Sequence, residues 1–244
     1  MTKTTILTLI LGLSLALSTA ASAATDDEKC EQALSIATGK YKLCMDKELG
    51  KNRGGKYDGP KLGAKLGQCV SKYTKTWPKL VKKYVGKGTS CEGDRYADNG
   101  DGTFYDRLTR LTWEKKTDDG SIHDQSNFYA WSTGSPWKAD GPAFTVFLKA
   151  LNDAGFAGSN GWRIPSVSEL NTLIEPPYPD CSALPGELPR CTTIPGETPP
   201  TTYLSSSPHP FFPDSVWGIM FEIGSATNVT KTTVRFVRAV SGGS

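Results

Sequence analysis

Histidine is scarce in this chain of 244 residues, and the motifs that mark common enzyme sites are missing. The two histidines are His123 and His209, and neither lies in an H-E-x-x-H zinc motif. The chain has no P-loop, no dinucleotide-binding fingerprint and no C-x-x-C pair. Serines 205–207 lie beside His209, but SSSPHP lacks the strand–turn–helix context of a G-x-S-x-G nucleophile. We therefore expect a protein that is not an enzyme and has no cofactor.

Long apolar runs are also few. One run, at residues 6–17, follows Lys3 and precedes Ala-Ser-Ala at 21–23, the small-x-small pattern that signal peptidase reads. The run is short for a membrane span, and no other stretch approaches about 18 apolar residues. Residues 1–23 are therefore predicted to be a signal peptide. We expect the mature protein to be soluble, without a transmembrane segment, and to be secreted, periplasmic or at the cell surface.

Charge is distributed unevenly along the mature chain. Residues 24–91 contain 15 Lys and Arg against 7 Asp and Glu, a net charge of +8, whereas residues 92–244 contain 12 against 18, a net charge of −6. A basic module therefore precedes an acidic domain. The basic face could attract anionic polysaccharides or other anionic polymers, although we expect no nucleic acid partner. It could equally be an ordinary solvated helix face, or it could dock onto the acidic domain.

The basic module has the apolar spacing of two helices. Apolar residues recur at intervals of three and four from residue 26 to about residue 49, and again from residue 62 to residue 84, where Pro78 indicates a kink or a restart. The intervening KNRGGKYDGP is rich in turn residues. The sequence therefore predicts an antiparallel helical hairpin over residues 24–91.

The cysteines of this hairpin can be paired by geometry. Cys30 and Cys44 are 14 positions apart, about 21 Å along a continuous helix, whereas a disulfide needs Cα atoms within about 7 Å. Antiparallel packing instead brings Cys44 beside Cys69 near the turn, and Cys30 beside Cys91 at the open end. Export allows such bonds to persist. We predict this nested pairing.

Residues 92–244 contain a series of short segments that point to one family. In order they are RYADNGDGTFYDRLTRLTWEK, GWRIPSVSEL, TTYLSSS, VWGIMFEIGS and VRFVRAV. Together they resemble the C-terminal domain of the Legionella collagen-like protein (Lcl), which is grouped with C-type-lectin-like folds. The resemblance covers about residues 94–242. It implies an α+β chain in which a C-type-lectin-like domain follows the small disulfide-stapled hairpin, and a role in adhesion or recognition with anionic polysaccharides as one ligand class.

Local patterns predict several elements of this domain. Asn-Gly and Asp-Gly pairs in RYADNGDGTFY indicate a β-hairpin. Helical spacing predicts a helix over residues 142–154, and Ser166 with Glu169 forms a capping box for a second. The segments at 216–224 and 232–240 are expected to form a closing pair of strands.

Several large residues of this domain are assigned to structural roles. Three tryptophans, Trp113, Trp162 and Trp217, and the apolar members of VRFVRAV are expected in the core. Three arginines are expected to pair with Asp or Glu: Arg163, Arg235 and Arg238.

A segment from Glu175 to Pro213 has eleven prolines and no periodicity, so we interpret it as one long loop of the kind that is often functional. Cys181 and Cys191 are expected to close a small loop within it. The candidate ligand-binding residues are Tyr178, Arg190, Tyr203, His209, Phe211 and Phe212. Their aromatic rings could stack on sugars or pack on a protein partner; anchoring of the loop to the core is the alternative.

Calcium is considered because of the resemblance to lectins. DNGDGTFYD offers Asp98, Asn99, Asp101 and Asp106 as oxygen ligands, but Ala97 occupies a position where a calcium loop needs an acid. A plain hairpin turn is favoured, and no metal site is assigned. The E-P-N, Q-P-D and W-N-D triplets of sugar-binding lectins do not occur in the chain.

These observations give three hypotheses for function. The first is an exported, non-catalytic protein that recognises an extracellular glycan or protein ligand. The second is a structural or assembly component of the cell envelope whose hairpin mediates oligomerisation. The third, raised by the likeness of GWRIPSVSEL to formylglycine-generating enzymes, is a degenerate relative of those enzymes.

Overall fold

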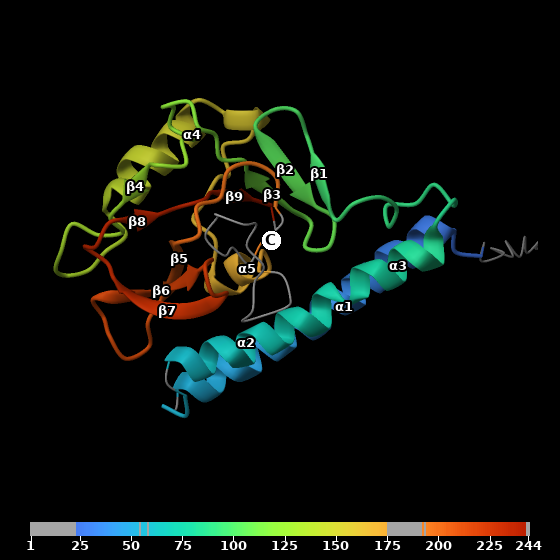
Figure 1. Ribbon diagram of the computed structural model, residues 1–244, viewed down its shortest axis with the longest axis horizontal. Helices are drawn as coiled ribbons and strands as arrows, with labels where there is room; N and C mark the ends of the chain where they lie inside the picture. The colour runs from blue at the N-terminus through green and yellow to red at the C-terminus, as the bar shows by residue number, and fades with distance from the viewer. Residues whose placement is uncertain (1–22, 54, 58, 175–191, 193, 243–244) are drawn as a thin grey trace, which may run out of the picture.

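The computed structural model describes residues 23–53, 55–57, 59–174, 192 and 194–242. Within these residues the chain is a mixed α+β protein in which N-terminal helices with two disulfides precede two β-sheets (Figure 1). The signal peptide predicted over residues 1–23 falls almost wholly outside the described residues. Tyr178, Arg190 and the Cys181–Cys191 pair lie outside them as well.

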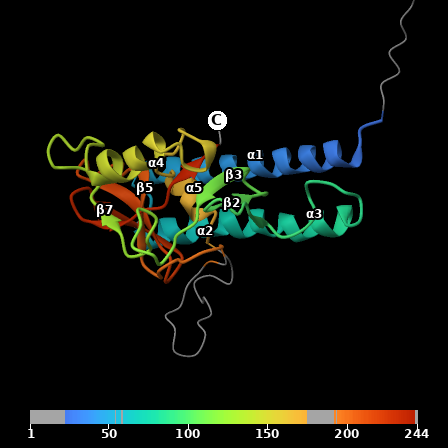
Figure 2. The ribbon, with the colours of Figure 1, turned by 90° about the horizontal axis from the view of Figure 1, so that it is seen from above.

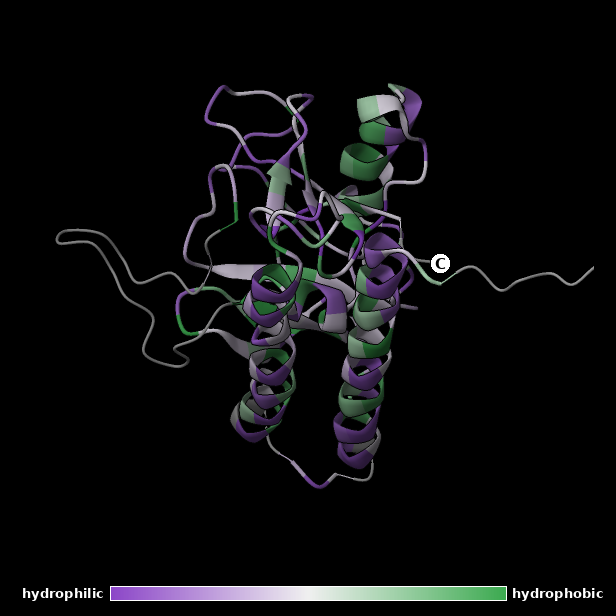
Figure 3. Ribbon diagram, turned by 90° about the vertical axis from the view of Figure 1, so that its right-hand side faces the viewer, coloured by the Kyte–Doolittle hydropathy of each residue, from purple (hydrophilic) through white to green (hydrophobic). Residues whose placement is uncertain are grey.

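The helical hairpin is present as predicted. Helix α1 (Asp26–Arg53) runs antiparallel to α2 (Gly59–Thr74) and α3 (Thr76–Tyr84), as Figure 2 shows. Pro78 explains the break between α2 and α3, because its ring nitrogen cannot donate to the carbonyl of Thr74. Figure 3 shows hydrophilic and hydrophobic residues interspersed along both arms. On α1 the buried residues, which include Leu34, Tyr41 and Met45, recur at helical spacing and so share one face.

Two disulfides join the arms of the hairpin, and both predicted pairs are confirmed. Cys30 bonds to Cys91 with Cα atoms 6.0 Å apart, and Cys44 bonds to Cys69 with Cα atoms 5.8 Å apart. The first closes the open end of the hairpin and the second lies nearer the turn. Figures 1 and 2 show α3 and the start of α1 projecting beyond the β-sheets.

The first sheet has the strand order β1-β2-β3-β9. Its strands are β1 (Tyr96–Asp98), β2 (Thr103–Asp106), β3 (Leu111–Glu114) and β9 (Val240–Ser241). The predicted β-hairpin is confirmed by the pairing of Tyr96 with Asp106. Because β9 pairs with β3, the end of the domain returns to its beginning.

The second sheet has the order β4-β8-β5-β6-β7 and corrects two predictions. Its strands are β4 (Phe128–Tyr129), β5 (Thr202–Pro208), β6 (Ser215–Met220), β7 (Ser225–Thr230) and β8 (Arg235–Phe236). The prediction of one loop over residues 175–213 is wrong for residues 202–208, which form β5 at the centre of the sheet. The closing pair of strands is also wrong, because β5 separates β6 from β8 and β6 pairs with β7 through a tight turn.

Short helices cover the remainder of the domain. The predicted helix over residues 142–154 is present as a π-helical segment, η1 (Ala143–Leu148), continued by α4 (Lys149–Asp153); a 3-10 turn, η2 (Phe156–Gly158), follows. Helix α5 (Val167–Asn171) begins at the predicted capping box. There Ser166 Oγ accepts the amide of Glu169, and the Glu169 carboxylate accepts the amide of Ser166. None of the helices in the described residues is long and apolar enough to cross a membrane.

The hairpin and the sheets share one apolar core. Its buried members come from both parts of the chain and include Leu34, Leu66, Trp113, Trp217 and Phe221. A second cluster lies inside the domain around Phe147 and Trp162. All three tryptophans assigned to the core are at most 4% exposed, so that prediction is confirmed, and Val237, Ala239 and Val240 are buried too.

Polar contacts fix the position of the hairpin against the domain. The Tyr41 hydroxyl donates to the carbonyl of Ser168 at 2.7 Å, and the Tyr73 hydroxyl donates to the carbonyl of Leu108. Figure 1 shows α2 beside β7, where a Cβ added at Gly63 would lie 3.0 Å from the amide nitrogen of Ala226. The basic module therefore docks onto the acidic domain, through an apolar core and neutral hydrogen bonds; the role of its net charge stays a prediction.

The three arginines differ in their partners. Arg163 pairs with Glu169 at 2.6 Å, as predicted. The prediction is wrong for the other two within the described residues. Arg238 is fully buried and donates to the carbonyls of Glu114 and Glu197, and Arg235 donates to the carbonyl of its neighbour Val234.

Candidate ligand-binding pocket

A cavity of about 380 Å³ lies between the end of α1, the loop after β5 and the β6–β7 turn. We call it the aromatic pocket. Its lining residues are Asn52, Tyr57, His209, Phe211, Phe212, Trp217, Met220, Ile223, Ser225, Ala226, Thr227 and Asn228. Its volume lies at the lower end of the range for small-ligand sites, about 300–1,000 Å³.

Four rings form one side of this pocket. The centroid of the His209 ring lies 4.4 Å from that of Trp217, 4.8 Å from that of Phe212 and 6.1 Å from that of Phe211. Trp217 is buried in β6 and supplies a fixed base for the other rings. The aromatic side of the pocket is thus anchored on the central sheet.

The loop after β5 is held in place by its own hydrogen bonds. The amide of His209 donates to the carbonyl of Ser215 at 3.0 Å, and the amide of Ser215 donates to the carbonyl of Phe212 at 2.9 Å. The amide of Phe211 donates to His209 Nδ1 at 3.3 Å. Burial lowers the pKa of His209 against an opposing effect of Asp214, which favours the neutral ring that this last bond needs.

The rim of the pocket exposes apolar surface. Phe211 is 47% exposed, Phe212 50% and Ile223 45%. Large hydrophobic side chains this exposed number nine in the described residues, and three of them gather at this one cavity. A contiguous apolar patch with polar residues around it is typical of a binding surface.

One residue that lines the pocket carries a buried polar atom without a partner among the described residues. Asn52 is only 3% exposed, and within the described part of the chain no donor reaches its side-chain oxygen, Oδ1. Asn52 and Trp217 also line a neighbouring cavity of about 280 Å³ beside Leu49 and Val167. Buried acceptors are nearly always paired, so this atom points to a missing donor.

The structure brings together half of the predicted ligand-binding residues. His209, Phe211 and Phe212 line the aromatic pocket, although their role in binding stays a prediction. The prediction that Tyr203 is an exposed loop aromatic is wrong: it is 1% exposed in β5 and packs on Phe221 at 4.9 Å. It lies with Leu204 and Ser205 in a run of three buried residues, because β5 is the central strand of its sheet.

Sequence reasoning missed the part of the pocket that the hairpin supplies. Asn52 ends a stripe at helical spacing formed by the buried Tyr41 and Met45 and the partly buried Leu49. A polar residue that continues an apolar stripe is a signal that was available in the sequence. Ile223 gave no such signal, because its position depends on the β6–β7 turn.

The serines near His209 have structural roles. Ser205 Oγ donates to the carbonyl of Trp217 at 2.6 Å and accepts the amide of Ser207. Ser207 Oγ accepts the amide of Val167 at 3.0 Å, which ties β5 to α5. Neither hydroxyl is paired with His209, whose Nδ1 is already an acceptor. These contacts do not form a nucleophile and base pair.

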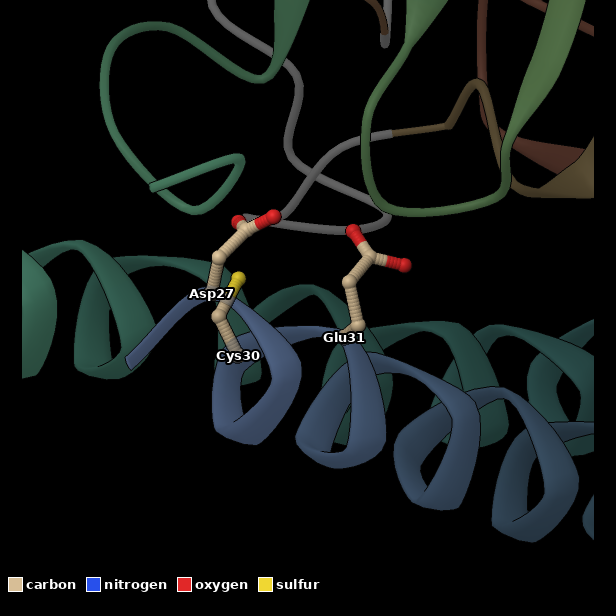
Figure 4. Close-up of side chains that lie close together, drawn as sticks. All are labelled: Asp27, Cys30 and Glu31. Atoms are coloured by element: carbon tan, nitrogen blue, oxygen red, sulfur yellow. The ribbon is translucent and has the colours of Figure 1, made fainter. Parts of the chain in front are cut away.

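Two groups of residues of the types that bind metal ions form other contacts, one on α1 and one in the β1–β2 hairpin. Figure 4 shows Asp27, Cys30 and Glu31 on one side of α1, but Cys30 Sγ is bonded to Cys91. The two carboxylates instead accept bonds from the amide and the hydroxyl of Ser90, which fasten the segment after α3 to the start of α1.

In the β1–β2 hairpin the carboxylates stabilise the turn. Asp98 accepts the amide of Gly100, Asp101 accepts the amide of Thr103, and Asp106 is paired with Arg95 at 2.7 Å. The predicted hairpin turn is confirmed by the strand register.

A buried charged cluster lies within the domain. Glu114 is fully buried, 2.9 Å from Lys116 Nζ and 2.9 Å from His123 Nδ1, and it also accepts the amide of Ala239. Burial would raise the pKa of Glu114, but the ammonium of Lys116 and the hydrogen bonds lower it below its usual range. The cluster joins β3 to the segment before β9, and we interpret it as a structural feature.

Comparison with known proteins identifies the family of the C-terminal domain. The family model of the Lcl C-terminal domain matches residues 102–241, more than half of the chain. This domain is found in Legionella collagen-like adhesin-type proteins. No match was found among curated proteins or among solved structures. The matched range contains both sheets apart from β1, and it includes the aromatic side of the pocket. The chain belongs to the Lcl C-terminal domain family.

Proposed function

We propose that this protein is an exported, non-catalytic recognition protein that binds an extracellular glycan through the aromatic pocket. The observation that carries the proposal is the exposure of Phe211 and Phe212 beside a cavity of about 380 Å³. Aromatic faces stack on the apolar faces of sugar rings, and nearby amide and hydroxyl groups can bind sugar hydroxyls. The C-type-lectin-like fold is part of this proposal, supported by membership of the family.

Export is supported by the disulfides. The Cys30–Cys91 and Cys44–Cys69 bonds would persist in an oxidising compartment such as the periplasm or the extracellular medium. The apolar run at residues 6–17 and its small-x-small site give the same prediction from the sequence.

A glycan array tests the proposal directly. The mature protein is compared with the F211A/F212A variant, which removes the two exposed rings while leaving Trp217 in place. We expect the variant to lose binding by tenfold or more, since stacking on aromatic rings supplies much of the affinity in such sites. The F128A variant is the control, because Phe128 is 58% exposed on β4 and does not line the aromatic pocket. Equal binding by F211A/F212A and wild type would place recognition elsewhere.

The basic hairpin could add attraction for anionic polysaccharides. Lys79, Lys82, Lys83 and Lys87 are exposed on the projecting end of the hairpin. Exposed charges are screened by salt over about 10 Å at 0.1 M. Binding through these lysines should therefore weaken steeply as salt rises, whereas binding in the aromatic pocket should not.

A second candidate function is assembly within the cell envelope. Ile36 is 52% exposed and Leu43 71% exposed, and they lie seven residues apart on α1. This spacing places both on one helix face, as in helices that pair with another helix. If assembly depends on this face, I36S/L43S should convert an oligomer to a monomer in light scattering. A monomeric wild-type protein would exclude this function.

A further inference from the structure

The unpaired acceptor in the aromatic pocket narrows the chemistry of the ligand. Asn52 Oδ1 is buried, and none of the described residues donates to it. Desolvation of an unpaired acceptor destabilises the free protein. A ligand that supplies an N–H or O–H donor would remove this penalty when it binds. A sulfate or carboxylate would not, because in its ionised form it carries only acceptor oxygens.

His209 provides the complementary group on the other side of the pocket. Its Nδ1 accepts the amide of Phe211, so the proton of the neutral ring lies on Nε2. Among the described residues, Nε2 forms no hydrogen bond or ion pair. The lining of the pocket therefore includes one residue with an unused acceptor, Asn52 on α1, and one with an unused ring N–H, His209, whose ring lies beside those of Trp217 and Phe212.

We propose that the aromatic pocket binds the acetamido group of an N-acetylated amino sugar; this inference rests on the proposed function. The acetamido N–H would donate to Asn52 Oδ1, and its carbonyl would accept from His209 Nε2. Its methyl group would pack against the rings beside His209, and the sugar ring would stack on the exposed face of Phe211. A plain hydroxyl could supply the donor but has no methyl group for this apolar surface.

Two trisaccharides that differ only in this group provide the test. Chitotriose carries an acetamido group at C2 of each sugar, and cellotriose carries a hydroxyl there. Binding of each to the full-length mature protein is measured by isothermal titration calorimetry or by chemical-shift titration. We expect chitotriose to bind at least tenfold more tightly, a difference of about 1.4 kcal/mol.

The N52L variant tests the role of the acceptor. Leucine is close to asparagine in size and lacks the oxygen, so the variant should lose the preference for chitotriose. Its melting temperature should equal or exceed that of the wild type, because an unpaired buried acceptor is removed. The combination of lost selectivity and kept stability separates a binding role from a structural one. N160L is the matched control, since Asn160 is exposed and lies outside the pocket.

The outcomes separate this inference from the proposed function. Equal affinity for the two trisaccharides, or a preference that persists in N52L, would overturn the acetamido assignment while leaving a glycan site in place. An N-acetylated dipeptide amide that competes with chitotriose and needs Asn52 would assign the pocket to peptides instead. If neither trisaccharide binds but an array glycan binds in a Phe211- and Phe212-dependent manner, only the acetamido inference fails.

Discussion

The contact between α2 and β7 can be tested by the substitution Gly63→Ala, which adds one methyl group at the interface. Gly63 lies on α2 where a Cβ would be 2.5 Å from Ser225 Oγ and 3.0 Å from the amide nitrogen of Ala226. The serine side chain can rotate away, but the backbone nitrogen of Ala226 is held in β7, which pairs along its whole length with β6. Gly39, on α1, is the matched position, because a Cβ there meets nothing within 4 Å.

The two Gly→Ala substitutions should therefore differ in their effect on the free energy of unfolding. Alanine favours a helix over glycine by about 1 kcal/mol, so G39A should be stabilised by about that amount. In G63A the same gain is opposed by an overpacking cost of about 1–3 kcal/mol. The variants should differ by this cost, which for a chain of this size corresponds to roughly 2–12 °C in melting temperature.

Thermal unfolding followed by circular dichroism measures this difference, and urea unfolding gives the free energies. A change in the tyrosine and tryptophan signal of the G63A native state would show that the hairpin has shifted on the sheet. If G63A were stabilised as much as G39A, α2 would not pack on β7 as described, and the shared core and composite pocket inferred from that contact would be refuted.

Three further predictions concern the disulfides, pH and the buried charges. C44A/C69A should lose about 3.5 kcal/mol and C30A/C91A about 4.3 kcal/mol of unfolding free energy in urea, since the loops of 25 and 61 residues differ in closure entropy; equal losses would contradict an entropic origin. The pKa of His209 is lowered in the folded state, so the folded protein binds fewer protons than the unfolded chain. The contribution of His209 to the free energy of unfolding is therefore fully present above about pH 6.5, and it declines as pH falls through that value. The melting temperature of the wild type minus that of H209F should therefore fall as pH is lowered from 8 to 5, and parallel curves would argue against this role. E114Q should cost about 3–5 kcal/mol because it leaves Lys116 buried without its partner, and K116M in the same chain should recover part of the loss; additive effects in the double-mutant cycle would contradict a coupled pair.

Much of the fold could be predicted because its signals are local. The capping box of α5 uses residues three positions apart, and the β1–β2 hairpin depends on adjacent turn residues. The disulfide pairing of the long hairpin followed from the length of a helix and the reach of a disulfide. In each case the contact follows from the number of residues that separate its two partners along the sequence.

The strand order could not be predicted, because it depends on contacts between distant segments. Strand β5 lies between β6 and β8, and its parallel pairing with β8 joins Tyr203 to Phe236. β7 has the polar sequence SATNVT, which gives little indication of a strand. It nevertheless pairs along its whole length with β6, since the turn at residues 221–224 brings it there. The pocket could not be predicted for the same reason, because Asn52 and Phe212 line it together only when the hairpin packs on the sheet.

The composite pocket changes how loss of the hairpin should be interpreted. Residues 92–244 alone would lack Asn52 and Tyr57, and they would also lack the apolar face that covers Trp217 and Phe221. Weakened ligand binding after truncation would therefore not show that the basic charges bind the ligand. Salt separates the two contributions in the intact chain, because a neutral pocket is screened little while exposed lysines are screened strongly. If N52L weakens binding equally at 0.05 M and 0.5 M salt, the hairpin contributes through its buried face. The second variant replaces Lys79, Lys82 and Lys83 by glutamine. If this variant loses affinity only at low salt, the charges add an independent attraction.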